Sequence, residues 1–279
     1  YQLVRGWGRS ESWMLGLVAL FMTLSFLTWA ARGRSLNLIG ILETTLQRAT
    51  PIVLAALSGV LCERSGIVNI AIEGMMLTAA ATSAVVASVS HSLWVGLLAA
   101  LIMAGLLGLL LAVLSIRFKV NQVISGTAIN ILATGATSYV SARYLQVYQH
   151  LNSPGKFPNV PVPLLARLTV LGPIFFETNV LVYLMLVLLV SIHVMLYYTR
   201  WGLRTRAIGE HPHAAATVGV DVNRMRYINV VLGGMVAGLG GAFLVLGSVP
   251  RFDELMTAGK GFIGLAALIF GKYNPFGAF

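Results

Sequence analysis

The sequence predicts an all-α fold, a polytopic bundle of transmembrane helices that forms one domain over residues 1–279. Only 10% of the 279 residues are charged and 57% are hydrophobic, whereas roughly 25% of the residues of a soluble domain are charged. The mean hydropathy is +0.84, and one soluble core could not bury so much apolar surface. Uncharged or nearly uncharged runs also recur along the chain, most of them near the roughly 20 residues that cross a bilayer.

Eight such runs are candidates for membrane crossings. They cover residues 12–31, 36–62, 67–90, 93–116, 123–142, 179–199, 227–249 and the shorter 261–270. The second run contains Glu43 and Arg48, and Pro51 is expected to break or kink it. The third run contains Glu73. We expect about eight crossings in this chain.

The basic residues predict the orientation of the chain. A net charge of +10 would suggest nucleic acid in a soluble protein, but here Lys and Arg lie between apolar runs, where they fix orientation in a membrane. Residues 200–226 hold the arginines Arg200, Arg204, Arg206, Arg224 and Arg226. We therefore expect this segment and the amino terminus on the cytoplasmic side, and no nucleic-acid partner. The prolines of residues 143–178 predict an irregular external loop.

Small residues at helical spacing predict close helix packing. Gly96, Ala100, Ala104, Gly108 and Ala112 recur every four positions. A GxxxG pair follows in residues 234–238. Such stripes let helix backbones approach closely in lipid, so we interpret them as packing faces.

Signatures of enzymes are missing from the sequence. It contains no HExxH, GxSxG or GxxxxGK[ST] motif, so a P-loop cannot bind ATP in this chain. Cys62 is the single cysteine, which excludes an intrachain disulfide and a cysteine-based metal cluster. The segment GKGFIG in residues 259–264 fits GxGxxG, but no βαβ unit surrounds it, so we reject it as a dinucleotide site. We expect a transport component without a cofactor or metal of its own.

Glu73 is the most informative acidic residue. A carboxylate this deep in an apolar run costs about 2.5–3.5 kcal/mol, so it should face the bundle interior or a water-filled path. Asn69 precedes it by four residues, on the same face of a helix. Gly66 and Gly74 bracket the pair, which favours a broken helix whose backbone lines a cavity. Equally, Glu73 could pair with a buried arginine or cap the broken helix.

A polar stripe follows in the run 123–142. Thr127, Asn130 and Thr134 are spaced by three or four residues, and Gln122 comes just before them. Neutral hydrogen-bonding groups on one face suit a neutral polar solute better than an ion. The alternative is hydrogen bonding between helices, worth under about 1 kcal/mol per contact.

The segment Pro212 to Gly219 predicts a short helix in the cytoplasmic loop. Proline is favoured at the first position of a helix and glycine just past its end. Three small residues, at 214–216, lie between them. A helix too short to cross a bilayer, with exposed small side chains flanked by arginines, suits docking into another protein. The alternative is a solvated basic loop.

Four segments in this order, GIVNIAIEGMML, NQVISGTAIN, GLRTRAIGEHPHAAATVGV and GKYNPFGA, resemble the permease subunits of bacterial ATP-binding-cassette (ABC) importers. These importers carry nucleosides or simple sugars and are related to ribose and branched-chain amino-acid permeases. The resemblance covers about residue 36 to the end. The form NIxxEG resembles the nucleoside branch, whereas sugar permeases tend to have DLSxG there.

The chain opens at Tyr1 without a methionine and closes at Phe279, so we expect truncation at both ends. The resemblance implies about ten membrane helices in an intact member, with one or two of them beyond Phe279. It also implies a multi-pass protein of the bacterial plasma membrane, a second permease subunit and an external solute-binding protein. Two cytoplasmic ATPase subunits would bind the ATP and Mg²⁺. A simple-sugar importer is the next alternative, and an ion-coupled secondary transporter or a membrane enzyme are less favoured.

Two sets of functional residues are therefore expected. The substrate path comprises Asn69, Glu73, Gln122, Thr127, Asn130 and Thr134. The coupling region, within residues 200–226, comprises Arg204, Arg206, Glu210, His211, Pro212, Ala214, Ala215 and Gly219.

Overall fold

The computed structural model describes residues 9–30, 37–163 and 172–279. The chain divides into two compact units, residues 1–42 and residues 43–279. The first contains α2 (Arg9–Ala30), in which the large apolar side chains Phe21, Met22 and Trp29 are each more than 60% exposed. An apolar surface of this kind fits lipid. The predicted run 12–31 is therefore helical, although its last residue and the first of run 36–62 lie outside the described residues.

Six helices in the described part of the chain are long and apolar enough to cross a membrane. They are α3 (Leu38–Glu63), α4 (Ile72–Ser90), α5 (Leu93–Ala112), α6 (Gln122–Val140), α7 (Val180–Tyr198) and α10 (Val222–Ala242). Single π-helical turns extend α5 to Arg117, α6 to Leu145 and α10 to Ser248. The polytopic helical bundle predicted from the sequence is confirmed. The run 261–270 forms α11 (Lys260–Phe270), which has 11 residues and is too short to cross a bilayer alone.

Two expectations about the helices need correction. Of the predicted break or kink at Pro51, the break is absent, because α3 continues through Pro51 from Leu38 to Glu63. The run 67–90 is helical only from Ile72, so the residues before it belong to a break between α3 and α4. Burial explains the first difference: Pro51 is packed inside the bundle, where neighbouring helices support a proline-containing helix.

The core of residues 43–279 is formed by α4 and α10 together with most of α3, whereas α5, α6 and α7 each expose one face. The predicted small-residue stripes join α5 to α10. A Cβ on Gly108 would lie 2.9 Å from the carbonyl oxygen of Val230, and one on Gly234 would lie 2.6 Å from that of Ala104. Backbones this close gain van der Waals contact that lipid could not replace.

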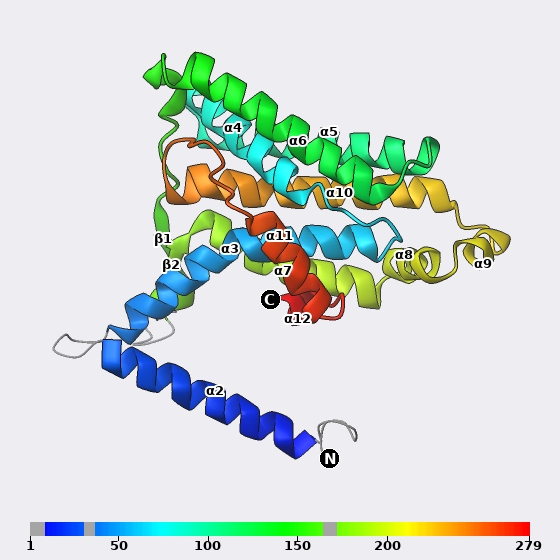
Figure 1. The fold of residues 1–279 in the computed structure, drawn as a ribbon, viewed down its shortest axis with the longest axis horizontal. Helices are drawn as coiled ribbons and strands as arrows, with labels where there is room; N and C mark the ends of the chain where they lie inside the picture. The colour runs from blue at the N-terminus through cyan, green and yellow to red at the C-terminus, as the bar shows by residue number, and fades with distance from the viewer. Residues whose placement is uncertain (1–8, 31–36, 164–171) are drawn as a thin grey trace. The chain divides into compact units, whose positions relative to one another are not determined.

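The two ends of the bundle differ in structure. At one end α7 leads into α8 (Arg200–Glu210) and α9 (Pro212–Thr217), and α10 begins (Figure 1). The other end carries a two-stranded antiparallel sheet, β1 (Asn159–Pro161) with β2 (Glu177–Asn179), in which Asn159 pairs with Asn179. The described parts of residues 143–178 otherwise consist of short turns and irregular chain, as the prolines predict. The helix α12 (Pro275–Ala278) ends the chain.

Candidate functional site

A turn and an irregular segment between α3 and α4 form the centre of the candidate site. Gly66 has φ +85 and follows the end of α3, where Ile67 N donates to Cys62 O at 3.2 Å. This is a glycine-terminated helix end, in which glycine adopts a left-handed conformation without steric cost. The chain then runs without helical structure until α4 begins at Ile72. The broken helix that the glycines predict is present.

Asn69 lies in this break and not on a helix. Its side chain is fully buried. The Oδ1 atom accepts from Ala71 N at 3.1 Å, and Nδ2 points to the sulfur atoms of Cys62 and Met75 at 3.5 and 3.7 Å. The expectation that Asn69 and Glu73 share one helical face is therefore wrong, because only Glu73 belongs to α4. Asn69 instead satisfies a backbone group that the break leaves without a helical partner.

Two side-chain amides of α6 form hydrogen bonds with backbone groups in and next to the same break. Asn130 Nδ2 donates to Ile70 O at 2.9 Å, and Asn130 Oδ1 accepts from Gly74 N at 2.8 Å. Gln122 Oε1 accepts from Val68 N at 2.7 Å. These side chains replace the hydrogen bonds that a continuous helix would make, as irregular backbone at membrane depth requires.

Glu73 links α4 to α11. Its Oε1 accepts from Gly259 N at 2.8 Å and its Oε2 accepts from Gly261 N at 2.7 Å. Gly259 and Gly261 lie at the start of α11, where backbone N–H groups lack helical partners and negative charge is favoured. A Cβ on Gly261 would lie 2.7 Å from Glu73 N, so only glycine permits this approach. Glu73 thus caps the start of α11 and not the broken helix itself, and no ion pair to Glu73 occurs among the described residues.

The remaining residues of the predicted polar stripe do not converge on one cavity. Thr127 is exposed, and its hydroxyl donates to Val123 O of its own helix at 2.9 Å. Thr134 is half-buried. Of the expected path residues, the structure thus brings Asn69, Gln122 and Asn130 together at the break and leaves the two threonines away from it.

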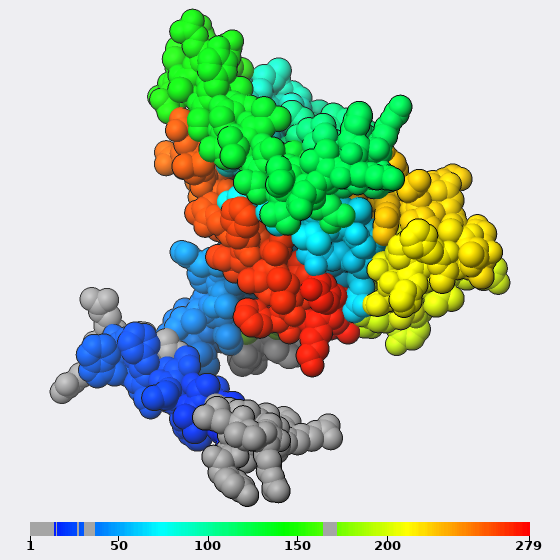
Figure 2. Space-filling model, turned by 45° about the vertical axis from the view of Figure 1, so that its right-hand side comes forward, coloured from blue at the N-terminus to red at the C-terminus, as the bar shows by residue number. Residues whose placement is uncertain are grey.

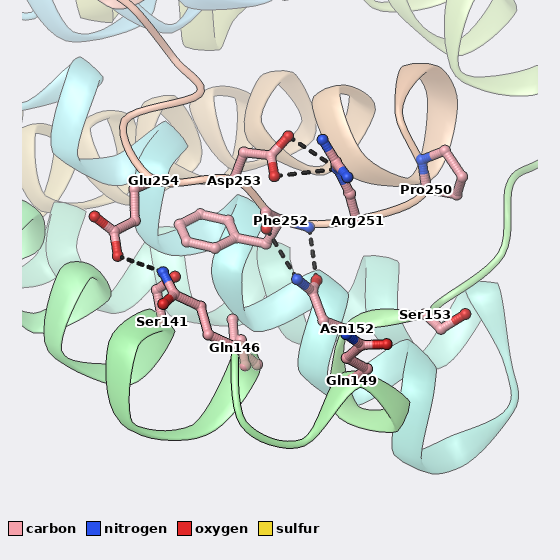
Figure 3. A pocket seen from close by; sticks show the side chains of 11 residues that line it. Ser141, Gln146, Gln149, Asn152, Ser153, Pro250, Arg251, Phe252, Asp253 and Glu254 are labelled. Atoms are coloured by element: carbon pink, nitrogen blue, oxygen red, sulfur yellow. Dashed lines mark hydrogen bonds and ion pairs between the residues drawn. The ribbon is translucent and has the colours of Figure 1, made fainter.

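A polar pocket of about 750 Å³ opens at the end of the bundle opposite α8 and α9. Figure 3 shows how its two walls are joined. The Asn152 side chain donates to Phe252 O at 2.9 Å and accepts from Phe252 N at 2.7 Å, and Gln146 Nε2 donates to Glu254 at 3.3 Å. Arg251 pairs with Asp253 at 3.1 Å. The sequence did not point to this pocket, because its walls come from irregular segments 100 residues apart.

The coupling region contains two short helices where the sequence predicts one. Pro212 is the first residue of α9. Gly219 has φ +84, and Val220 N donates to Ala215 O at 3.1 Å, so the predicted proline start and glycine end of the helix are present. The preceding α8 is a correction, because its residues were expected to form a loop. The hydroxyl of Thr199 caps α8 by accepting from Gly202 N at 3.2 Å, and threonine before a helix is a signal that could have predicted α8.

Most expected coupling residues lie at the surface of α8 and α9. Arg204, Glu210, His211, Ala214 and Gly219 are exposed. Pro212 and Arg206 are half-buried, and the Arg206 guanidinium lies 5.0 Å from the centre of the Tyr197 ring. Ala215 is buried, with 4% of its surface exposed. The exposed face of α9 therefore includes Ala214 but not Ala215.

The end of α8 touches the helix break directly. A Cβ on Gly209 would clash with the carbonyl oxygen of Arg64. Arg226 Nε, on α10, donates to Ser65 O at 3.1 Å. Arg64 Nε donates to Tyr273 O at 2.9 Å. The turn after α3 is thus held by three elements, α8, α10 and the segment before α12, and the expectations from sequence did not include Arg64.

No metal centre is evident: among the residues that the structure describes, no group of three or more His, Cys, Asp or Glu side chains could hold a metal ion.

The sequence of the chain matches one known protein family. The family described as "Branched-chain amino acid transport system / permease component" matches residues 41–279. The chain belongs to this permease family.

Relatives of this permease carry names within the same class of transporter. The guanosine ABC transporter permease protein NupQ of Bacillus subtilis is 40% identical over 245 residues, which cover 85% of this chain and 77% of the relative. The nucleoside ABC transporter permease protein NupC of Lactococcus lactis is 36% identical over 85% of this chain and 77% of the relative. The putative glucose ABC transporter permease protein TsgC13 of Haloferax volcanii is 35% identical, with coverages of 85% and 71%.

No solved structure matches the chain significantly. The resemblance recognised in the sequence is confirmed, since the family and these relatives are permease subunits of ABC transporters. This permease is a multi-pass membrane protein and a transport component, not an enzyme.

Proposed function

We propose that this permease forms the translocation path of an ABC importer for nucleosides and is driven by ATPase subunits that dock on α9. The observation that carries the coupling part is the pair α8 and α9 at one end of the bundle (Figure 2). Its outer surface exposes Arg200, Arg204 and Val218, the last at 78%. A short helix with exposed small, apolar and basic groups suits a groove on a partner protein.

Nucleosides are the proposed cargo because two relatives with 36% and 40% identity are named for nucleoside or guanosine transport. A simple sugar is the second candidate, favoured by the relative named as a putative glucose permease. An external solute-binding protein would capture the solute, and a second permease subunit would complete the path. ATP and Mg²⁺ would bind to the ATPase subunits.

The distribution of basic residues supports a cytoplasmic position for α8 and α9. The end of the bundle with these helices also carries Arg64, Arg117, Lys119, Arg224 and Lys272. Such an excess is typical of the cytoplasmic side of a bacterial membrane protein. Because α3 ends on this side and one crossing would precede it, we place the amino terminus in the cytoplasm as well.

The contacts of α8 suggest how ATP binding would act on the path. A docked ATPase that prefers one position of α9 shifts the permease toward the matching state, since coupling requires only different contact energies in two states. Because Gly209 of α8 lies against the carbonyl group of Arg64, a movement of α8 would also move the helix break. From there, Glu73 connects α4 to α11.

Replacing Ala214 tests the docking role of α9. We expect Ala214→Glu to weaken co-purification of the ATPase and to reduce uptake at least tenfold, because it places a buried charge in the interface. Ala214 is exposed, so the permease itself should retain its stability. Ala215 is unsuitable for this test because it is buried.

The matched control is Ala142→Glu, at an exposed alanine of the opposite end of the bundle. Equal co-purification and uptake in the Ala214 and Ala142 variants would contradict the docking role. A competition panel of nucleosides, bases and sugars against uptake by the assembled complex identifies the cargo. Uptake that persists with a protonophore while ATP is maintained is expected, whereas collapse with the ion gradient would contradict an ATP-driven mechanism.

A further inference from the structure

A second cavity lies among α3, the end of α10 and α11. Its volume is about 600 Å³, within the range of about 300–1,000 Å³ that is usual for small-molecule sites. Pro51 and Ile52 of α3, Phe243 and Leu244 at the end of α10, and Ile263 of α11 line its apolar part. We call it the α3–α11 crevice.

Three of the six polar side chains that line the crevice belong to α3. Thr44, Gln47, Arg48 and Pro51 project from one face of this helix, since residues three, four and seven apart are neighbours on a helix. All four line the crevice. Apolar walls with a few polar groups are the usual composition of a small-molecule site.

Arg48 is the unusual member of this set. It belongs to a helix of crossing length and its side chain is exposed, and an arginine in such a helix generally faces a water-filled cavity or path because contact with lipid is costly. Among the described residues, no hydrogen bond or ion pair engages its guanidinium. Its five N–H donors are therefore available to a ligand in the crevice.

Neighbouring groups do not neutralise this charge. Asp253 also lines the crevice, but it pairs with Arg251 at 3.1 Å. Lys260 adds a second positive charge, with its Nζ atom donating to Met256 O at 3.2 Å and to Thr257 O at 3.1 Å. Gln47 donates to Glu43 at 3.2 Å. The crevice lining thus carries two positive charges, Arg48 and Lys260, against the one negative charge of Asp253, which is paired with Arg251. This balance favours a ligand that presents acceptors to Arg48.

We propose that the α3–α11 crevice binds the base of 6-oxopurine nucleosides, with Arg48 donating to the base edge. This inference rests on the proposed nucleoside function. A 6-oxopurine presents two adjacent acceptors, O6 and N7, which match the fork of an arginine, whereas a 6-aminopurine presents a donor at the same position. The apolar floor formed by Pro51, Ile52 and Phe243 then covers the face of the base.

Inosine and adenosine provide the first test, because inosine has an oxygen at position 6 and a hydrogen on N1, whereas adenosine has an amino group at position 6 and no hydrogen on N1. The assembled complex in vesicles is assayed for uptake of each. We expect the wild type to favour inosine, and Arg48→Gln to lower the inosine-to-adenosine ratio roughly tenfold through loss of a charged donor pair. Arg143→Gln, at an exposed arginine outside the crevice, is the matched control and should keep the wild-type ratio.

Site-directed labelling provides the second test. The only native cysteine, Cys62, is fully buried, so a new cysteine reports its own surroundings. Ser248→Cys lies in the lining of the crevice, and Ser90→Cys is an exposed control at the same end of the bundle. Inosine should slow labelling of the first by a thiol reagent and leave the second unchanged, and Arg48→Gln should abolish this protection.

The possible failures are distinguishable. Wild-type complex that carries sugars and no nucleosides would overturn the proposed function and this inference with it. Wild-type complex that carries nucleosides, with an unchanged ratio in Arg48→Gln, would overturn the inference alone. Equal loss of inosine and adenosine uptake, without protection at Ser248→Cys, would also overturn it, since Arg48 would then act without contacting the base.

Discussion

Replacing Glu73 tests whether its carboxylate holds the start of α11. Two backbone N–H groups, of Gly259 and Gly261, donate to it at 2.8 and 2.7 Å. Hydrogen bonds to a charged group contribute about 1.5–3 kcal/mol each, and a carboxylate at a helix start adds about 0.3–1 kcal/mol. Glu73→Ala should therefore remove about 3–7 kcal/mol of local stabilisation, which is an upper range because water can reach some of the freed groups.

Glu73→Gln should have a smaller effect. One side-chain oxygen remains as an acceptor, but the new nitrogen faces an N–H donor and the negative charge is lost. We expect a loss of about 2–3 kcal/mol, with the membrane fold retained and transport impaired.

Hydrogen exchange of the assembled complex measures this effect at the amides of Gly259 and Gly261. A local loss of about 3 kcal/mol corresponds to roughly hundredfold faster exchange. Glu177→Gln is the control, because Glu177 is an exposed carboxylate on β2. The capping explanation is refuted if exchange at residues 259–261 is the same in Glu73→Ala and in the control.

Two further substitutions test the break and its contact with α8. Asn130→Leu should destabilise the complex by about 2–4 kcal/mol, because two backbone groups lose their partners. Thr127→Val on the same helix should change stability by under about 0.5 kcal/mol, and thermal unfolding that does not separate the two would disprove this role. Gly209→Ala should displace α8 from Arg64 and lower ATP-driven uptake while the ATPase still co-purifies. Gly135→Ala, where a Cβ meets nothing within 4 Å, should transport normally, and equal uptake in both variants would exclude coupling through this contact.

Local signals explain what could be predicted from the sequence. Pro212 and Gly219 act on the chain within a few residues of themselves, so the start and end of α9 could be recognised without knowing the fold. The stripe that includes Ala104 and Gly108 has a helical period, and the structure places it against α10 as a packing face. Apolar runs of crossing length likewise identify helices one at a time.

The partners of the polar residues could not be predicted, because they depend on distant segments. Glu73 binds Gly259 across 186 positions of the chain, and no spacing rule connects them. The spacing of four residues between Asn69 and Glu73 predicts that the two side chains share one face of a helix. Gly66 ends α3 before Asn69 is reached, so the spacing rule does not apply. Arg48 was visible as a charge in an apolar run, yet its place in a crevice required the position of α11.

The residues that close the break have an electrical consequence. Asn69, Gln122 and Asn130 are neutral amides, which neither gain nor lose protons near physiological pH. Moving a full charge across a membrane potential of 100 mV would require about 2.3 kcal/mol. A rearrangement of these three amides would require none of that work, so the hydrogen bonds that they make to the break do not depend on the membrane potential.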